Sequence, residues 1–177
     1  MRYLLIVFWL LFAGSVVGQE INWMTMNEAL EAQKKEPRKI FMDAYTTWCG
    51  PCKMLDKNTF SDKSVIEYLN KNYYAVKFNA EGEEIVNYKD ITYTNPNFRP
   101  ERKGRNAQHH FARALNVNAY PTVVFFKENG DLIQAIPGYQ TPRQLEIFLK
   151  MIHSDDYLKI TTAEAWQNYR ENFEHTF

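Results

Sequence analysis

The chain has 177 residues, and its 21 basic residues balance its 21 acidic ones. That balance gives no reason to expect nucleic acid or an anionic membrane as a partner. Hydrophobic residues make up 45% of the chain and charged residues 24%, a composition that supports one well-packed domain and argues against wholesale disorder.

The first residues are typical of an export signal. One basic residue, Arg2, precedes an apolar stretch that ends in small residues, and a cut after Gly18 would leave Gln19 first. The apolar stretch is shorter than the roughly 20 residues that a membrane-spanning helix needs. We therefore expect residues 1–18 to be a signal peptide and the protein to be periplasmic or secreted. An uncleaved membrane anchor is the alternative.

Helix and strand patterns then alternate along the chain. A capping box made by Thr25 and Glu28 opens a helix expected from Met26 to about Lys35. The apolar run 40–45 predicts a buried strand, and a helix is expected to start at the cysteines that follow. Further elements are expected as a helix over 61–69, a strand over 73–79, a short helix over 107–115, a hairpin of strands 120–127 and 132–137, and a helix opened by a second capping box at 141.

Both cysteines of the chain lie in one motif, Trp48-Cys49-Gly50-Pro51-Cys52-Lys53. Two thiols separated by two residues can close and reopen a small disulfide ring, whereas so short a loop gives little structural stabilisation. Cys49 would stand at the N-terminus of the following helix, where unpaired N–H groups and the helix dipole lower a thiol pKa from its usual value of about 8.5. The motif therefore predicts an exposed redox pair in which Cys49 is the reactive thiol.

A zinc site is the other chemistry that a Cys-x-x-Cys pair can serve. Zinc needs about four ligands, and the candidates for the second pair are His109 and His110. Adjacent histidines are poorly placed to bind one ion together, so we expect no metal. Both histidines are expected to be exposed on the short helix over 107–115.

Two segments are not explained by these patterns. Residues 81–106 are the least readable part of the chain. Within them the run 94–105 is turn-rich and basic and lacks any period, so we expect a solvated loop there, with a partner-docking loop as the alternative. In the last residues, 154–177, a helix start at 161–164 precedes Trp166, Tyr169 and Phe173. That stripe is expected to fold back onto the domain, and a partner surface is the alternative.

The order of the elements predicts an α/β fold with a central mixed sheet covered by helices on both faces. Its domain is expected to span residues 19–153, followed by the helical extension 154–177. The cysteine motif follows the C-terminal end of a sheet strand, which is where α/β folds carry their chemistry.

The motif resembles the active-site hexapeptide of the thioredoxin family. Asp43, six residues before Cys49, is similar in position to the buried aspartate of thioredoxins, and Lys77 to the lysine near that aspartate. Residues 120–122 are similar to the loop whose cis proline faces the dithiol, and Gly138 to a glycine beside the substrate groove. The resemblance covers roughly residues 21–153 and implies a thioredoxin-like fold with an inserted loop and an extra C-terminal helix.

A second resemblance narrows the family. Thr59-Phe60-Ser61-Asp62 is similar to a stretch of the periplasmic C-terminal domain of the bacterial transmembrane thiol:disulfide interchange reductase. Tyr45 departs from the family, because thioredoxin usually has a tryptophan there. The resemblance implies protein thiol and disulfide substrates, an upstream membrane dithiol as electron donor, no cofactor and a monomeric chain.

The resemblance also implies roles for the site residues. Cys49 would attack a substrate disulfide. Cys52, which would lie deeper, would resolve the mixed disulfide after losing its proton to Asp43, directly or through a water, and Lys77 would modulate the pKa of Asp43. The alternatives are a merely polar strand-end aspartate and an ordinary surface-reaching lysine. Pro121 would help to hold an extended substrate chain in a groove together with Trp48, Gly50, Pro51, Tyr120, Gly138 and Tyr139.

Three functions remain open from the sequence. The leading hypothesis is an exported protein-disulfide reductase. The second is an oxidase or isomerase that uses the same site at a higher reduction potential. The third is a non-catalytic binding module that uses the inserted loop and the C-terminal extension.

Overall fold

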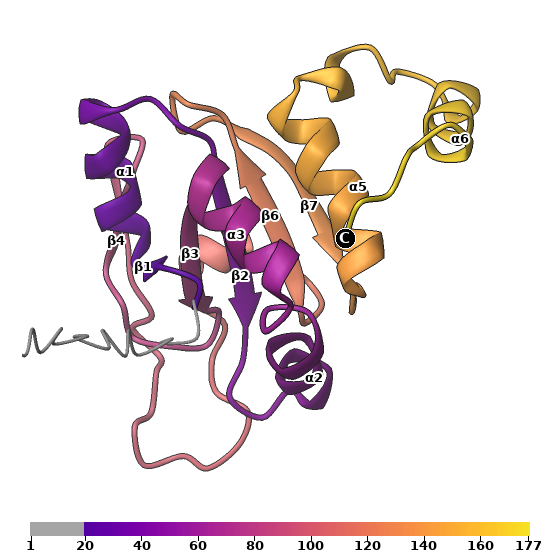
Figure 1. The fold of residues 1–177 in the computed structure, drawn as a ribbon. Helices are drawn as coiled ribbons and strands as arrows, with labels where there is room; N and C mark the ends of the chain where they lie inside the picture. The colour runs from indigo at the N-terminus through magenta and orange to yellow at the C-terminus, as the bar shows by residue number, and fades with distance from the viewer. Residues whose placement is uncertain (1–19) are drawn as a thin grey trace, which may run out of the picture.

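The computed structural model describes residues 20–177, so the expected signal peptide lies outside the described residues. Within this range no helix is long and apolar enough to cross a membrane. Figure 1 shows a twisted central sheet with helices packed on both of its faces.

Five strands form the central sheet, and their bounds in spatial order are β1 (Trp23–Met24), β3 (Tyr74–Asn79), β2 (Ile40–Tyr45), β6 (Thr122–Phe126) and β7 (Leu132–Pro137). β1, β3 and β2 run parallel, whereas β6 and β7 pair antiparallel. The predicted mixed sheet is therefore confirmed. Its register sets Asp43 on β2 directly opposite Lys77 on β3.

The sheet divides the core into two layers, and helices cover each of its faces. α2 (Gly50–Asn58), α3 (Lys63–Asn72) and α5 (Pro142–His153) cover one face, and α1 (Met26–Lys35) and α4 (His110–Ala114) cover the other. Phe41 packs in the first layer, whereas Met42 packs in the second. Since side chains alternate along a strand, Asp43 shares the face of Phe41, which is the face that α2 covers.

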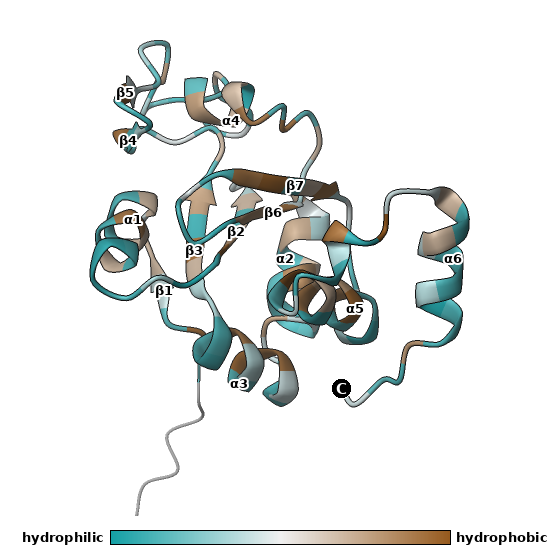
Figure 2. Ribbon diagram, turned by 90° about the horizontal axis from the view of Figure 1, so that it is seen from above, coloured by the Kyte–Doolittle hydropathy of each residue, from teal (hydrophilic) through white to brown (hydrophobic). Residues whose placement is uncertain are grey.

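Part of the inserted segment 81–106 is folded. β4 (Val86–Tyr88) and β5 (Ile91–Tyr93) form a two-stranded sheet joined at Lys89 and Asp90, whose φ angles are 50° and 61°. The Tyr88 ring packs edge-on against Phe111 of α4 at 5.3 Å between centroids, so the hairpin lies beside that helix (Figure 2). The sequence did not predict this hairpin, because its two-residue turn lacks the Asn-Gly pair that usually signals one. Residues 94–105, where a loop was expected, contain no helix or strand.

The expectation that His109 is exposed was wrong. Its side chain is fully buried and caps α4, because ring Nδ1 accepts the Phe111 N–H at 3.0 Å. Nε2 lies 2.7 Å from the Glu84 carbonyl oxygen, to which it donates in the neutral ring. Burial lowers the pKa of His109, and a neutral ring matches both contacts.

The C-terminal residues fold back onto α5. After a 3-10 helix, η1 (Asp156–Leu158), the chain forms α6 (Ala163–Glu171), capped by the Thr162 hydroxyl. The Trp166 ring stacks on Phe148 of α5 at 5.6 Å between centroids, and Figures 1 and 2 show α6 standing beside α5, away from the sheet.

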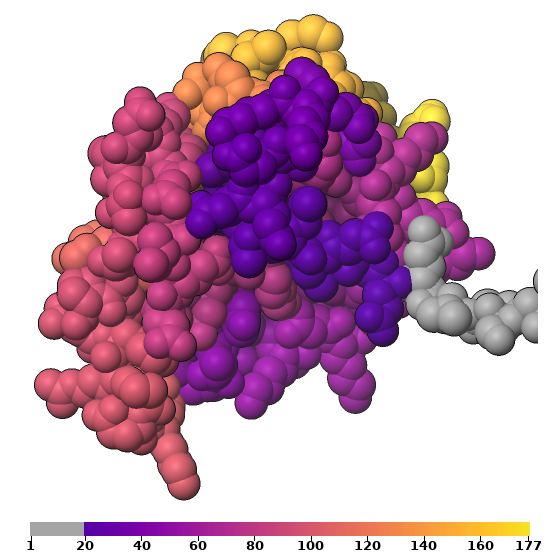
Figure 3. Space-filling view, turned by 90° about the vertical axis from the view of Figure 1, so that its left-hand side faces the viewer, coloured from indigo at the N-terminus to yellow at the C-terminus, as the bar shows by residue number. Residues whose placement is uncertain are grey.

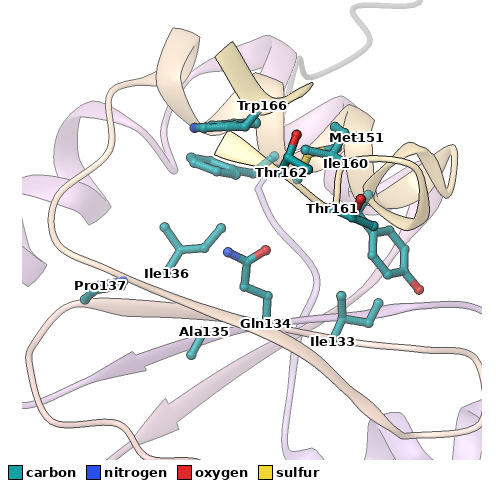
Figure 4. Close-up of a pocket in the computed structure, with 12 residues that line it drawn as sticks. Ile133, Gln134, Ala135, Ile136, Pro137, Met151, Ile160, Thr161, Thr162 and Trp166 are labelled. Carbon is teal, nitrogen blue, oxygen red and sulfur yellow. The ribbon is translucent and has the colours of Figure 1, made fainter. Parts of the chain in front are cut away.

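A groove of about 460 Å³ lies between β7, α5 and this C-terminal extension. Figure 4 shows Gln134 of β7 pointing into it beneath Trp166. Its lining contains no residue of the cysteine motif, so the site of the predicted chemistry lies elsewhere.

Candidate active site

Cys49 is the N-cap residue of α2, as the sequence predicted. Its Sγ accepts the backbone N–H of Cys52 at 3.1 Å, and Pro51 stands in the first turn. The two cysteines form a disulfide with their Cα atoms 5.3 Å apart. When the disulfide opens, the free N–H groups of this first turn favour a negative charge on the Cys49 sulfur.

The cysteines are less exposed than expected. Cys49 and Cys52 are each 2% exposed, so Cys52 is not the deeper of the two. Gly50, Pro51 and Lys53 are exposed beside them.

Asp43 is a buried carboxylate on the strand that leads to the motif, 1% exposed. Lys77 Nζ lies 2.7 Å from its Oδ2, and neither oxygen accepts a well-aligned hydrogen bond. Burial raises the pKa of Asp43 to about 6, although the Lys77 charge opposes the rise. A carboxyl group with this pKa can take and release a proton close to neutral pH.

Lys77 is held by acids and aromatic rings. It pairs with Asp56 of α2 as well as with Asp43. Its ammonium also lies 5.0 Å from the ring centroids of Trp23 and Tyr45. Burial would lower the pKa of Lys77, but the two carboxylates outweigh it and raise the pKa, so the lysine stays charged. Tyr45, which departs from the thioredoxin pattern, therefore helps to hold this cation.

The residues expected to line the substrate groove make three different contacts. The Tyr120–Pro121 bond is cis, and the Pro121 carbonyl accepts the Gly138 N–H at 2.7 Å, with Gly138 at φ +96°. Tyr120 packs edge-on against Trp48 at 6.1 Å between centroids. The Tyr139 hydroxyl accepts a hydrogen bond from Asn58, at the opposite end of α2 from the cysteines.

Three residues of the insertion contact the site but were not identified from the sequence. The Glu81 carboxylate accepts the Trp48 indole N–H and the Asn106 backbone N–H, both at 2.7 Å. The Arg105 guanidinium lies over the Trp48 ring, 4.4 Å from its centroid. The Glu81 contact joins residues 33 positions apart, which no local pattern reveals. The basic run around Arg105 was the visible signal.

Comparison with known proteins identifies relatives with thiol–disulfide chemistry. The thioredoxin-like domain model of protein families matches residues 26–153. The thiol:disulfide interchange protein DsbD of Pectobacterium atrosepticum is 28% identical over 131 residues, which are 73% of this chain and 18% of that protein. The thiol-disulfide oxidoreductase ResA of Oceanobacillus iheyensis is 25% identical over 141 residues, 77% of this chain and 66% of that one. The chain thus spans under a fifth of DsbD.

Solved structures share the fold. A thioredoxin-fold protein from Helicobacter pylori has a TM-score of 0.59 at 14% identity, covering 89% of this chain and 91% of its own. A thioredoxin from Thermus thermophilus has a TM-score of 0.55 at 17% identity, covering 75% and 87%. The family match covers most of the chain and contains both cysteines, so this protein belongs to the thioredoxin-like family of thiol–disulfide oxidoreductases.

Proposed function

We propose that this protein is an exported oxidoreductase that reduces disulfides in protein substrates. The contact that carries the proposal is the Cys52 N–H donating to Cys49 Sγ at the start of α2. A sulfur in this position is a better thiolate than a free cysteine and is the expected nucleophile. The relatives named for thiol:disulfide interchange support the same chemistry.

The proposed cycle moves two electrons. The Cys49 thiolate attacks one sulfur of the substrate disulfide, which forms a mixed disulfide and releases the other substrate sulfur as a thiolate. Cys52 then loses its proton and attacks Cys49, which releases the second substrate thiolate and closes the Cys49–Cys52 disulfide. The substrate has gained two electrons, and the protein has lost them.

Asp43 is the proposed acceptor of the Cys52 proton. It lies on the sheet face that α2 covers, and its raised pKa lets it take up that proton and pass it on to water or to a leaving thiolate. Lys77 keeps the pKa from rising further, so that enough of the carboxylate stays ionised at neutral pH to act as a base.

The oxidised protein must be reduced again, and we propose a membrane dithiol as the donor. An exported protein has no thiol pool that would keep it reduced. The DsbD relatives are named for interchange, which matches an electron relay. The expected signal peptide would put the chain in the compartment where such a relay is needed.

A glutathione equilibrium titration tests the direction of electron flow. A reductase is expected to lie nearer to thioredoxin, at about −270 mV, than to the strong oxidant DsbA, at about −120 mV. A value close to that of DsbA would reject the reductase and favour the oxidase or isomerase.

A trapping experiment tests the nucleophile and identifies substrates. Cys52→Ser is expected to accumulate mixed disulfides through Cys49, because the resolving thiol is missing, and mass spectrometry of the trapped partners would name them. The matched control, Cys49→Ser with Cys52→Ser, should trap nothing. An alkylation rate that titrates no lower than about 8.5, the value of a free cysteine, would contradict the activated thiolate.

A further inference from the structure

The inserted segment is attached directly to the active-site tryptophan. Glu81 and Arg105 contact Trp48, one with its indole N–H and the other with its ring face. Trp48 is the residue immediately before Cys49 in the chain. A substrate chain that reaches the dithiol therefore passes close to the insertion.

The basic part of the insertion has a defined shape. The Asn106 side chain accepts the Arg99 N–H at 3.0 Å and donates to the Arg99 carbonyl at 2.7 Å, which closes the loop 99–106 at its base. Asn95, which is buried, pins the neighbouring backbone by donating to the carbonyls of Gly82 and Ala107. The loop presents its side chains from a fixed base, which reduces the entropy that binding would cost.

The charges on this loop are unpaired. Between residues 99 and 105 four side chains are basic and only Glu101 is acidic. All four basic side chains are exposed, and none lies within ion-pairing distance of a carboxylate in the described part of the chain; they are Arg99, Arg102, Lys103 and Arg105. In Figure 3 this part of the chain projects from the body of the molecule.

We propose that the loop 99–105 is a docking surface for an acidic segment next to the disulfide of a protein substrate. The proposal rests on the proposed function and adds the chemistry of the substrate. Clustered positive charge beside a reactive centre raises the local concentration of negatively charged partners and speeds their association. The chain as a whole is neutral, so this preference would come from the loop and not from net charge.

The test compares disulfide peptides that differ only in the residues flanking the disulfide: aspartates, serines or lysines. The reduced wild-type protein is expected to reduce the aspartate peptide at least about tenfold faster than the lysine peptide at low ionic strength. The ratio should fall toward one as salt is added, because exposed charges are screened.

Charge reversal locates the effect. The double variant Arg102→Glu with Lys103→Glu should lower the aspartate-to-lysine rate ratio at least about threefold, in line with the loss of local steering. The matched control is Lys35→Glu with Lys71→Glu, which changes the net charge equally. These two exposed lysines lie on α1 and α3 before the starts of β2 and β3, whereas the dithiol follows the end of β2. The control should keep the wild-type ratio.

Each failure has its own signature. Equal rates for the three peptides, or equal losses in the two double variants, would overturn the docking surface and leave the reductase intact. No reduction of any peptide would overturn the proposed function and the docking surface with it. Binding of the wild-type protein to anionic phospholipid vesicles, together with equal peptide rates, would assign the basic loop to a membrane instead.

Discussion

The Asp43 carboxylate is destabilising when ionised, because it is buried and has one cation as its partner. Its pKa of about 6 in the folded protein lies above the value of about 3.9 in an unfolded chain. When folding raises the pKa of a group, the free energy of unfolding is highest at a pH below the unfolded-state pKa, where the group is protonated in both the folded and the unfolded protein. The stability is lost as the pH rises from about 4 through 6.

Asp43→Asn should therefore stabilise the protein at neutral pH. The shift of roughly two pKa units corresponds to a gain of up to about 3 kcal/mol, since one unit is 1.36 kcal/mol. Urea unfolding at pH 7.5 and pH 4 would measure it, and the gain should shrink at the lower pH. A loss of stability at pH 7.5 would contradict the conclusion that the ionised, buried Asp43 carboxylate destabilises the folded protein.

The same substitution should slow catalysis if Asp43 takes the Cys52 proton. General bases typically contribute about a hundredfold or more, so the resolution step should slow by about that factor at pH 7. Stopped-flow kinetics of mixed-disulfide resolution should also lose the titration near 6 that the wild type has. A merely structural aspartate would leave the shape of the pH profile unchanged.

Asp56→Asn is the matched control for both measurements. Asp56 shares Lys77 with Asp43, and its negative charge raises the pKa of Asp43. Its removal should move the kinetic titration below 6 and preserve most of the rate.

The sequence revealed residues whose signal is local or belongs to a family pattern. Cys49 could be placed at a helix start because Pro51 and the apolar strand before it are neighbours in the chain. Lys77 could be matched to Asp43 through the resemblance. Asp56 and Glu81 could not be found in this way, because their roles come from contacts between residues 21 and 33 positions apart.

Among the elements, helices with strong caps were predictable. The capping boxes at Thr25 and Thr141 open α1 and α5 at the expected residues. β1 was not predicted, because two residues of strand carry no periodicity and form only by pairing with β3. The β4–β5 hairpin was missed because its turn residues, Lys89 and Asp90, lack the Asn-Gly pair that usually signals a two-residue turn.

The insertion should depend on Glu81 for its position. Glu81→Ala removes the acceptor for the Trp48 indole and the Asn106 N–H, and each lost hydrogen bond to a charged group is worth about 1.5–3 kcal/mol locally. Hydrogen exchange of residues 99–106 should become faster, with the central strands unchanged. Glu83→Ala is the control, since Glu83 is exposed. Equal exchange in the two variants would show that the loop is held by other contacts.

At the scale of the whole molecule, the C-terminal residues tie two helices together. The buried Glu146 carboxylate of α5 accepts the Thr176 N–H at 2.6 Å and lies 2.7 Å from His175 Nδ1. The Phe177 ring packs edge-on against Tyr68 of α3 at 5.6 Å between centroids. The extension therefore closes over the layer that also contains α2, although it lies outside the matched family segment.

Glu146→Gln should loosen the attachment of the last C-terminal residues to α5. Burial alone would raise the pKa of Glu146, but Lys150, the Thr176 N–H and His175 outweigh it and lower the pKa to about 2. A lowered pKa contributes stability above the unfolded value, which is lost as the pH falls from about 4.5 toward 2. The variant should thus lose about 2–3 kcal/mol at pH 7, and the loss should shrink below pH 4.

Urea unfolding and limited proteolysis of the extension would measure this loss. Glu174→Gln makes the same chemical change at an exposed position of the same segment, so it should leave both measurements near the wild type. The hydrogen bonds of the Glu146 carboxylate within the described part of the chain go to Lys150 and residues 175–177 and not to the cysteine motif. The rate of thiol exchange should therefore stay unchanged in both variants, while the extension of Glu146→Gln is cut faster. Equal proteolysis of the two variants would mean that the aromatic stacking of Trp166 on Phe148 holds the extension without the carboxylate.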